Sequence, residues 1–371
     1  MHEAHHGRIL AVDSLDQFDE LVAAGALHMS GWRLQDLDLL ERSDALRRLD
    51  PAGALFLGCD LTREDTRSIR DRGGIVFGEV PGMPFSAYRA KLYSGDELIE
   101  GIEAGYEHCF DARVYAWSRS GEQDVARALA SALHDHSIDT ELREWVVGRQ
   151  VVGVMGGHAI ERGSREYRQA ADLGRRLALA GRTVATGGGP GIMEAANLGA
   201  RASAVDAQTL DAHIDTLAAH PSFKNRFLEW VESAQEVNRQ LPPGTENLGV
   251  PTWFYGHEPP NLFASSIAKY FQNSVREDTL LKVANNGVIV TPGGGGTTQE
   301  IFQDACENSY ADEGGWAPLV LLGHDYWTQT LPAWPLLQAV MRDRPGAAGI
   351  AIVDTVDEAL ERILAFTPST T

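Results

Sequence analysis

The chain has 371 residues, of which 43% are hydrophobic and 23% charged, and it carries a formal net charge of −20. The length predicts two domains, and the composition is ordinary for a globular protein that builds a substantial core. The negative charge argues against nucleic acid or an anionic membrane as a partner, because either needs a basic protein face. No apolar run reaches the roughly 18 residues that a membrane-spanning helix needs.

The cysteines and the N-terminus indicate a cytoplasmic protein. The three cysteines are scattered and odd in number, with no metal-ligand spacing, which fits a reducing compartment. The first residues lack the basic segment and apolar stretch of a secretory signal. Three histidines in this stretch are interpreted as part of a frayed tail rather than a metal site: His2, His5 and His6.

Residues 1–143 are expected to form an N-terminal α/β domain whose role is unknown and is regulatory in one interpretation. The predicted elements are strands at 8–12, 54–57 and 75–77, and helices at 15–23, 62–72, 96–106 and 121–136. No catalytic motif occurs here, and three acids are interpreted as exposed surface residues: Asp60, Asp65 and Glu79. The polar stretch 137–144 marks the expected boundary with a second domain, residues 144–371.

The second domain alternates apolar β-branched runs with helical patterns. Strands are predicted at 150–155, 183–185, 247–255, 288–290, 318–322 and 349–353. Helices are predicted at 164–181, at 204–240 with a break at Pro221, at 265–283 and at 356–365. This alternation predicts a Rossmann-like α/β fold, with a doubly wound and mostly parallel sheet.

The stretch from Val288 to Glu300 is the strongest functional signal. A buried strand ends at Pro292, four glycines follow, and Thr297 is expected to open a helix. A glycine turn between a strand and a helix N-terminus makes a site for an anion, usually a phosphate. The alternative is a capping box, in which Thr297 and Glu300 only tie down the start of their own helix.

Two further glycine turns follow predicted strands. One is Gly187-Gly-Gly-Pro-Gly191, followed by Ile-Met193, and the other is Gly156-Gly157-His158. Ligands of doubly wound sheets bind at the carboxyl ends of the strands, so the three turns are expected at one edge. The 187–191 turn does not fit the dinucleotide fingerprint, because Ile192 occupies the position of the third glycine. The sequence also argues against a P-loop, since Thr297 and not lysine follows Gly296.

These motifs resemble those of a known family. Pro292-Gly-Gly-Gly-Gly-Thr-Thr-Gln-Glu300 is similar to the P-G-G-x-G-T-x-x-E signature of the Lonely Guy proteins, and Gly187-Gly-Gly-Pro-Gly-Ile-Met193 to their G-G-G-x-x-G-x-M turn. The family comprises cytokinin-riboside-monophosphate phosphoribohydrolases and bacterial nucleotide nucleosidases, many labelled lysine decarboxylases. The resemblance covers roughly residues 148 to 355, and it is specific for the superfamily rather than for one substrate.

The resemblance implies hydrolysis of the N-glycosidic bond of a nucleoside 5′-monophosphate to free base and ribose 5-phosphate. Glu300 is then the carboxylate that stabilises an oxocarbenium-like state and orients or deprotonates water. Arg276 matches a required arginine of the family and would hold phosphate or ribose. The implied binding residues are Gly293, Gly294, Gly295, Gly296, Thr297, Gly187, Gly188, Gly189, Gly191, Met193, Gly156 and Gly157.

Departures from short family members favour a bacterial-type nucleosidase over cytokinin specificity. Short members carry serine in the first loop, where this chain has Gly156-Gly157-His158, and they lack its first 140 residues and the 204–240 segment. His158 is interpreted as either a base contact or a structural hydrogen bond. Glu194 is either a second carboxylate beside the sugar or, preferably, an ordinary acid of the first helical turn.

Two other functions remain open at this point. One is a non-catalytic nucleotide-binding, carrier or sensor protein on the same fold. The other is an amino-acid decarboxylase, which needs a pyridoxal Schiff-base lysine, and no lysine sits in a recognisable motif: Lys91, Lys224, Lys269 and Lys282. The hydrolysis needs no cofactor, and no metal-ligand cluster is recognised. The resemblance also implies a homo-oligomer.

Overall fold

The computed structural model describes residues 10–78, 80, 82–89, 91–120, 125–224, 226–255, 258–311 and 315–366. The histidine cluster at residues 2–6 and Glu79 lie outside the described residues. The chain divides into two compact units, one of residues 1–92 and 116–141 and one of residues 93–115 and 142–371. The boundary expected at residues 143 and 144 stays a prediction, and residues 137–144 lie within a helix.

Unit 1 contains a four-stranded parallel sheet in the order β1-β2-β3-β4. Its strands are Leu10–Val12, Trp32–Gln35, Leu55–Leu57 and Ile75–Phe77, joined through α1 (Leu15–Ala23), α2 (Ser43–Arg48) and α3 (Arg63–Asp71). Neighbours in the sheet are also neighbours in the sequence, so right-handed crossovers place these helices on one face. The left-handed residues Asp36 and Gly58 follow β2 and β3 at matching positions. Of these strands and helices of unit 1, β2 and α2 are absent from the sequence prediction.

Asp65 in α3 is buried, and the expectation that it is a surface acid was wrong. Its side chain is 2% exposed. The hydroxyl of Ser43 donates to Asp65 Oδ2 at 2.5 Å, and the hydroxyl of Thr62 donates to the same oxygen at 2.6 Å. Asp65 therefore ties the start of α3 to α2.

The helix predicted at residues 96–106 is broken in the structure. It is replaced by α4 (Gly95–Leu98) and two single turns, Ile102–Ala104 and Tyr106–His108. Gly101 and Gly105 both have positive φ, which ends a right-handed helix. The next elements are α5 (Phe110–Arg119), which the sequence did not predict, and the long α6 (Val125–Val146).

Unit 2 is built on a seven-stranded sheet in the order β11-β10-β9-β5-β6-β7-β8, and its strand pairs are parallel. The strands are β5 Val151–Met155, β6 Thr183–Thr186, β7 Leu248–Gly249, β8 Ser266–Ile267, β9 Val288–Val290, β10 Leu319–Leu322 and β11 Ile350–Val353. The predicted α/β class with a doubly wound parallel sheet is confirmed. The strand order reverses between β5 and β9, which makes this point the topological switch of the sheet.

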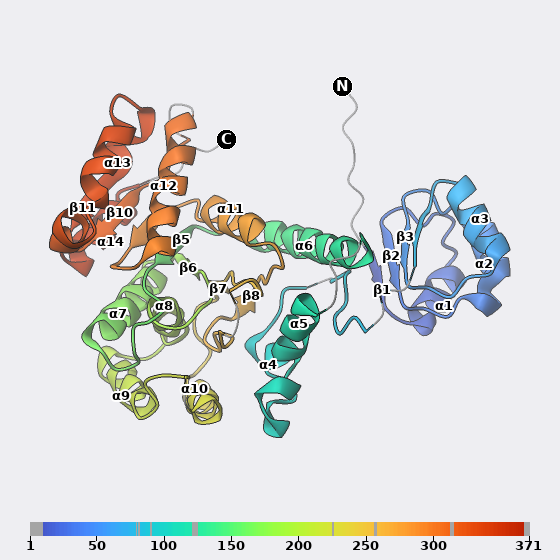
Figure 1. The fold of residues 1–371 in the computed structure, drawn as a ribbon, viewed down its shortest axis with the longest axis horizontal. Coiled ribbons are helices and arrows are strands. Elements are labelled where there is room, and N and C mark those ends of the chain that lie inside the picture. The colour runs from blue at the N-terminus through green and yellow to red at the C-terminus, as the bar shows by residue number, and fades with distance from the viewer. Residues whose placement is uncertain are drawn as a thin grey trace. The chain divides into compact units, whose positions relative to one another are not determined.

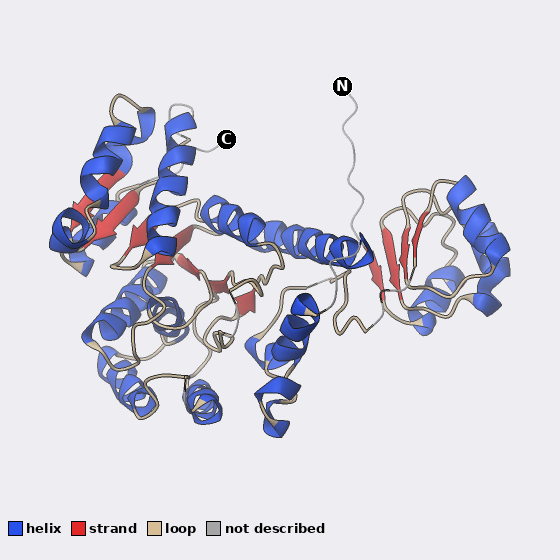
Figure 2. Cartoon of the chain, viewed as in Figure 1, coloured by secondary structure: helices blue, strands red, loops and turns tan. Residues whose placement is uncertain are grey.

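Helices cover both faces of this sheet (Figures 1 and 2). They are α7 Arg165–Leu179, α8 Ile192–Arg201, α9 Ala207–Ala218, α10 Phe227–Gln240, α11 Asn273–Val283, α12 Gly295–Tyr310, α13 Ala333–Met341 and α14 Val356–Leu364. The crossovers run outward from the switch point in both directions, so α7 and α8 lie on one face and α12 on the other.

Two predictions for unit 2 need correction. The helix expected at 265–283 begins only at Asn273, because residues 266–267 pair with β7 as the edge strand β8. The strand expected at 247–255 is only two residues long, and α13 was not predicted. The two helices expected on either side of Pro221 are confirmed as α9 and α10. Within the described residues, no helix is long and apolar enough to cross a membrane.

Candidate functional site

The structure places the three glycine turns at one edge of the unit 2 sheet. Residues 156–157 follow β5, residues 187–191 follow β6, and residues 293–296 follow β9. Because β9, β5 and β6 are adjacent parallel strands, their carboxyl ends meet at this edge. The first and third turns flank the topological switch point, where doubly wound folds bind their ligands.

The backbone of the first turn connects the other two. The amide of Gly157 donates to the carbonyl of Pro292 at 3.1 Å, and the carbonyl of Gly157 accepts from the amide of Ile192 at 3.2 Å. A Cβ on Gly156 would lie 2.1 Å from Thr291 Oγ1, so only glycine permits this approach. The three turns therefore form one contiguous surface.

The third turn ends in an open helix N-terminus. Helix α12 begins at Gly295 with Gly294 as its N-cap and no side-chain cap, so neither the capping box nor a start at Thr297 is correct. The first helical hydrogen bond there runs from Thr298 N to Gly294 O, which leaves the preceding amides as donors. The first turn of α12 carries no acid, and residues 294–296 are exposed. This terminus is well suited to an anion.

A buried amide network fixes the second turn from beneath. The hydroxyl of Thr186 accepts from the amide of Gly188 at 3.0 Å and donates to Asn197 Oδ1 at 2.6 Å. Asn197 Nδ2 donates to Asn247 Oδ1 at 2.7 Å, and Asn261 Nδ2 donates to Asn197 Oδ1 at 2.9 Å. Because buried polar groups are costly unless paired, this network holds the 187–191 backbone in one position.

Arg276 and Glu300 meet beside the second turn. Arg276 Nη1 lies 3.6 Å from Glu300 Oε1, and 3.0 Å from Oε2 of Glu277, the next residue of α11. A Cβ on Gly187 would lie 2.8 Å from Arg276 Nη2, so the missing side chain lets the guanidinium approach the turn. Arg276 Nε is buried and donates to no group among the described residues. A buried donor without a partner is costly, which makes Arg276 Nε a candidate contact for a ligand.

Burial raises the pKa of Glu300 to about 7, while the charge of Arg276 lowers it and that of Glu277 raises it. The Glu300 side chain is 10% exposed. A carboxyl group with this pKa exchanges its proton near neutral pH, which is the property of a general acid or base.

Glu194 is buried in an ion pair, and it also lines a small cavity beside Pro190 and Gly191 of the second turn. Arg162 binds its carboxylate with both Nε and Nη2, at 3.0 and 2.5 Å, and the hydroxyl of Tyr167 donates to it at 3.0 Å. Both side chains of the ion pair are 1% exposed. Of the two interpretations of Glu194, the sugar-side carboxylate is therefore disfavoured.

Replacing Glu194 by alanine is expected to lower the free energy of unfolding by about 3–5 kcal/mol, because it leaves the Arg162 charge buried without its partner. Urea unfolding followed by circular dichroism measures this loss. The exposed first-turn acid Glu166 provides the control, since its removal should cost at most about 1 kcal/mol. An unchanged stability for Glu194→Ala would contradict the assignment.

A second buried acid, Asp304, follows Glu300 by one turn of α12. Burial raises its pKa from 3.8 to about 8, the charge of Glu307 adds to the rise, and a 2.8 Å hydrogen bond from Asn308 opposes it. The unfolded chain therefore loses this proton at a lower pH than the folded chain does. As a result, the free energy of unfolding falls as the pH rises from about 4 to about 8.

Asp304→Asn is accordingly expected to raise the melting temperature most at pH 8 and above, with the gain shrinking towards pH 5. Differential scanning fluorimetry from pH 5 to pH 9 tests this. Parallel melting curves for the two proteins across that range would show that Asp304 is ionised in the folded state.

Sequence reasoning did not find several residues that shape this site. Glu277 had no signal beyond its position after Arg276. Tyr326, whose hydroxyl donates to the carbonyl of Gly293 at 2.8 Å, lies in a short π-helix far from the motif. Glu258 Oε2 lies 3.3 Å from where a Cβ of Gly189 would be. His158 is exposed, and Met193 packs against the second turn.

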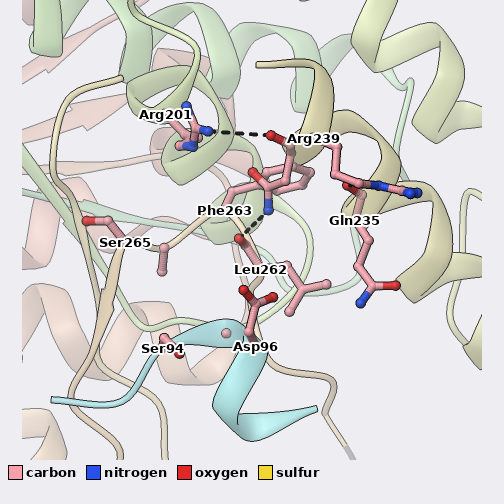
Figure 3. Close-up of a pocket in the computed structure, with 11 residues that line it drawn as sticks. Ser94, Asp96, Arg201, Gln235, Arg239, Leu262, Phe263 and Ser265 are labelled. Carbon is pink, nitrogen blue, oxygen red and sulfur yellow. Dashed lines mark hydrogen bonds between the residues drawn. The ribbon is translucent and has the colours of Figure 1, made fainter. Parts of the chain in front are cut away.

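A cavity of about 620 Å³ lies away from these turns (Figure 3). It contains none of the predicted site residues. Two of its polar side chains already bond within the fold, because Arg201 donates to the carbonyls of Asn238 and Leu241, and Asn238 donates to the carbonyl of Leu262. The cavity is therefore not the candidate active site.

Neither a metal cluster nor a Schiff-base lysine stands out. No group of three or more metal-binding side chains occurs in the part of the chain that the structure describes. Lys269 is buried, and its amine forms a 2.6 Å ion pair with Asp111. An ion-paired ammonium is a poor nucleophile, which disfavours Lys269 as a cofactor-binding lysine.

A comparison with family models supports the relationship suggested by the motifs. Residues 149–206 match the model of the SLOG cluster4 family, which is of the Lonely Guy type. This part of the chain is related to the Lonely Guy family. The matched segment contains the 156–157 turn and the Lonely Guy-type turn at 187–193, whereas the 292–300 signature lies outside it. No curated protein matches the chain.

Solved structures that are similar to part of the chain include two molybdenum cofactor proteins. The molybdenum cofactor binding protein from Rippkaea orientalis is 16% identical, covers 58% of this chain and 96% of its own, and has a TM-score of 0.35. The Moco carrier protein from Chlamydomonas reinhardtii is 18% identical, covers 58% of this chain and 98% of its own, and has a TM-score of 0.34. Likenesses this distant do not indicate what this chain binds.

Proposed function

We propose that unit 2 hydrolyses the N-glycosidic bond of a nucleoside 5′-monophosphate and releases free base and ribose 5-phosphate. The observation that carries the proposal is the pair of Glu300 and Arg276 beside the glycine turns. A buried carboxyl with a pKa of about 7 lies 3.6 Å from a guanidinium whose buried Nε has no partner among the described residues. The relationship of residues 149–206 to the Lonely Guy family supports the same reaction.

In this proposal the substrate phosphate binds the open N-terminus of α12, at residues 294–297, through backbone donors and the helix dipole. Arg276 holds the phosphate or the sugar. The C–N bond breaks with its electron pair leaving on the base, and positive charge develops on the sugar. Glu300 stabilises that charge and takes a proton from the attacking water, while the base takes up a proton. The sum is the addition of one water molecule.

The direct test is incubation of the purified chain with AMP, GMP, IMP, CMP or UMP in the presence of EDTA. Chromatography is expected to show free base and ribose 5-phosphate in equal amounts from at least one nucleotide. Release of neither product, with the melting temperature raised by a monophosphate, would support a non-catalytic binding, carrier or sensor role instead.

We also propose that the enzyme acts in the cytoplasm as a homo-oligomer and that the N-terminal region has a regulatory role. Light scattering of the full chain tests the assembly. Comparing base release by the full chain with release by a chain that lacks only residues 1–92, which belong to unit 1, tests the regulatory role.

A further inference from the structure

Glu300 shares the guanidinium of Arg276 with a second carboxylate, that of Glu277. The two carboxylates of Glu277 and Glu300 face the one guanidinium of Arg276, and the side chains of all three are at most 10% exposed. If both carboxylates were ionised, this buried group would hold one negative charge in excess. Burying an uncompensated charge is costly, so one carboxylate keeps its proton near neutral pH.

Distances and hydrogen bonds indicate which of the two carboxylates interacts more strongly with the guanidinium. Arg276 Nη1 is 3.0 Å from Glu277 and 3.6 Å from Glu300. Asn273 Nδ2 also donates to Glu277 Oε1 at 3.3 Å, and the hydroxyl of Tyr255 approaches the same oxygen at 3.5 Å. The contact of Arg276 with Glu277 Oε2 is ionic, because this oxygen accepts no hydrogen bond from the described residues, and at the shorter distance Glu277 competes better than Glu300 for the charge of Arg276.

We propose that Glu277 is a positioning residue for the proposed hydrolysis: by competing with Glu300 for Arg276, it sets the protonation of Glu300. The charged groups that act on Glu300 from α11 are Arg276 and Glu277. Its own helix carries Asp304 one turn later, and Glu258 lies beside Gly189 of the second turn. The inference rests on the proposed function only where activity is the measurement.

The test compares the pH dependence of base release for the wild type and Glu277→Gln. The wild-type rate is expected to rise with a midpoint near pH 7, as Glu300 becomes a base. In Glu277→Gln, Arg276 is left to Glu300 alone, so the midpoint should fall by roughly one pH unit or more. The variant should fold, because one carboxylate per guanidinium is a better-balanced pair than two.

Asp278→Asn is the matched control. Asp278 is the next acid on α11, and its 2.5 Å ion pair is with Lys282 rather than with Arg276. Its loss removes the same charge from the same helix, and the midpoint is expected to stay near that of the wild type. An equal shift in both variants would show a general charge effect and overturn the inference, as would a wild-type midpoint near the ordinary 4.5 of glutamate.

A second measurement separates this inference from the proposed function. The raised pKa of Glu300 makes wild-type stability fall as the pH rises from about 4.5 to about 7. Glu277→Gln should lessen that fall, whether or not the protein cleaves nucleotides, and melting temperatures from pH 4.5 to pH 8 record it. If no base is released but stability falls less with pH in Glu277→Gln than in the wild type, only the proposed hydrolase activity is overturned. If base is released but the pH profiles of base release and of melting temperature are the same in Glu277→Gln and the wild type, only the role of Glu277 is overturned.

Discussion

Replacing Glu300 by glutamine is expected to lower base release by about 100- to 10,000-fold while nucleotide binding persists. Glutamine has almost the same shape as glutamate but neither accepts the proton of the attacking water nor carries charge to stabilise the sugar cation. The loss should therefore appear in kcat rather than in the dissociation constant. Single-turnover assays with the best nucleotide measure the chemical step directly, and calorimetry measures the binding.

Asp304→Asn is the matched control for this experiment. Asp304 lies on the same helix, is similarly buried and also has a raised pKa, but its partner is Asn308 rather than Arg276. Its substitution should leave base release close to that of the wild type. Normal turnover by Glu300→Gln would refute the catalytic role of Glu300 and leave it a buried partner of Arg276.

Replacing Gly296 by aspartate is expected to weaken nucleotide binding by at least about 100-fold without destabilising the protein. Gly296 is exposed in the first turn of α12, and a Cβ there meets nothing within 4 Å. A carboxylate at a helix N-terminus stabilises the helix by about 0.3–1 kcal/mol. The same charge repels a substrate phosphate at those amides, and like charges in contact cost several kcal/mol. Stability and binding should therefore change in opposite directions.

The controls for Gly296→Asp separate charge from size. Gly296→Asn has the same shape without the charge, and Gly296→Ala adds only a methyl group and favours the helix by up to about 1 kcal/mol. Both should bind nucleotide far better than the aspartate variant. Titration with AMP and with ribose 5-phosphate by calorimetry provides the comparison. Equal binding by all three variants would place the phosphate elsewhere.

Much of the fold was predictable because its signals are local. The glycine turns, the apolar strands next to them and helices such as α1 and α3 follow from residues adjacent in the sequence. Parallel pairing then places the carboxyl ends of β5, β6 and β9 at one edge, which is why the three turns were expected together.

The wrong predictions concern two kinds of segment. In one, glycines interrupt a helical pattern, and in the other, a strand pairs with residues far away in the sequence. Gly101 and Gly105 interrupt an otherwise helical pattern at 96–106 through their positive φ angles. Residues 266–267 resemble the start of the following helix, yet they pair with β7 and with Tyr93. These partners lie outside the short stretch of sequence from which the helix was predicted. Of the four strands of unit 1, only β2 was missed, because its sequence Trp32-Arg-Leu-Gln35 contains no apolar run.

The sequence by itself determined where a phosphate-like anion is expected, because a strand, a glycine turn and a helix start depend only on the local backbone. Only the tertiary structure decided the charge of the site. Arg162 forms a buried ion pair with Glu194, whereas Arg276 is shared by Glu277 and Glu300. The reason is physical: ionisation depends on burial and on the distances to other charges, and both are set by how α8, α11 and α12 pack rather than by the residues next in sequence.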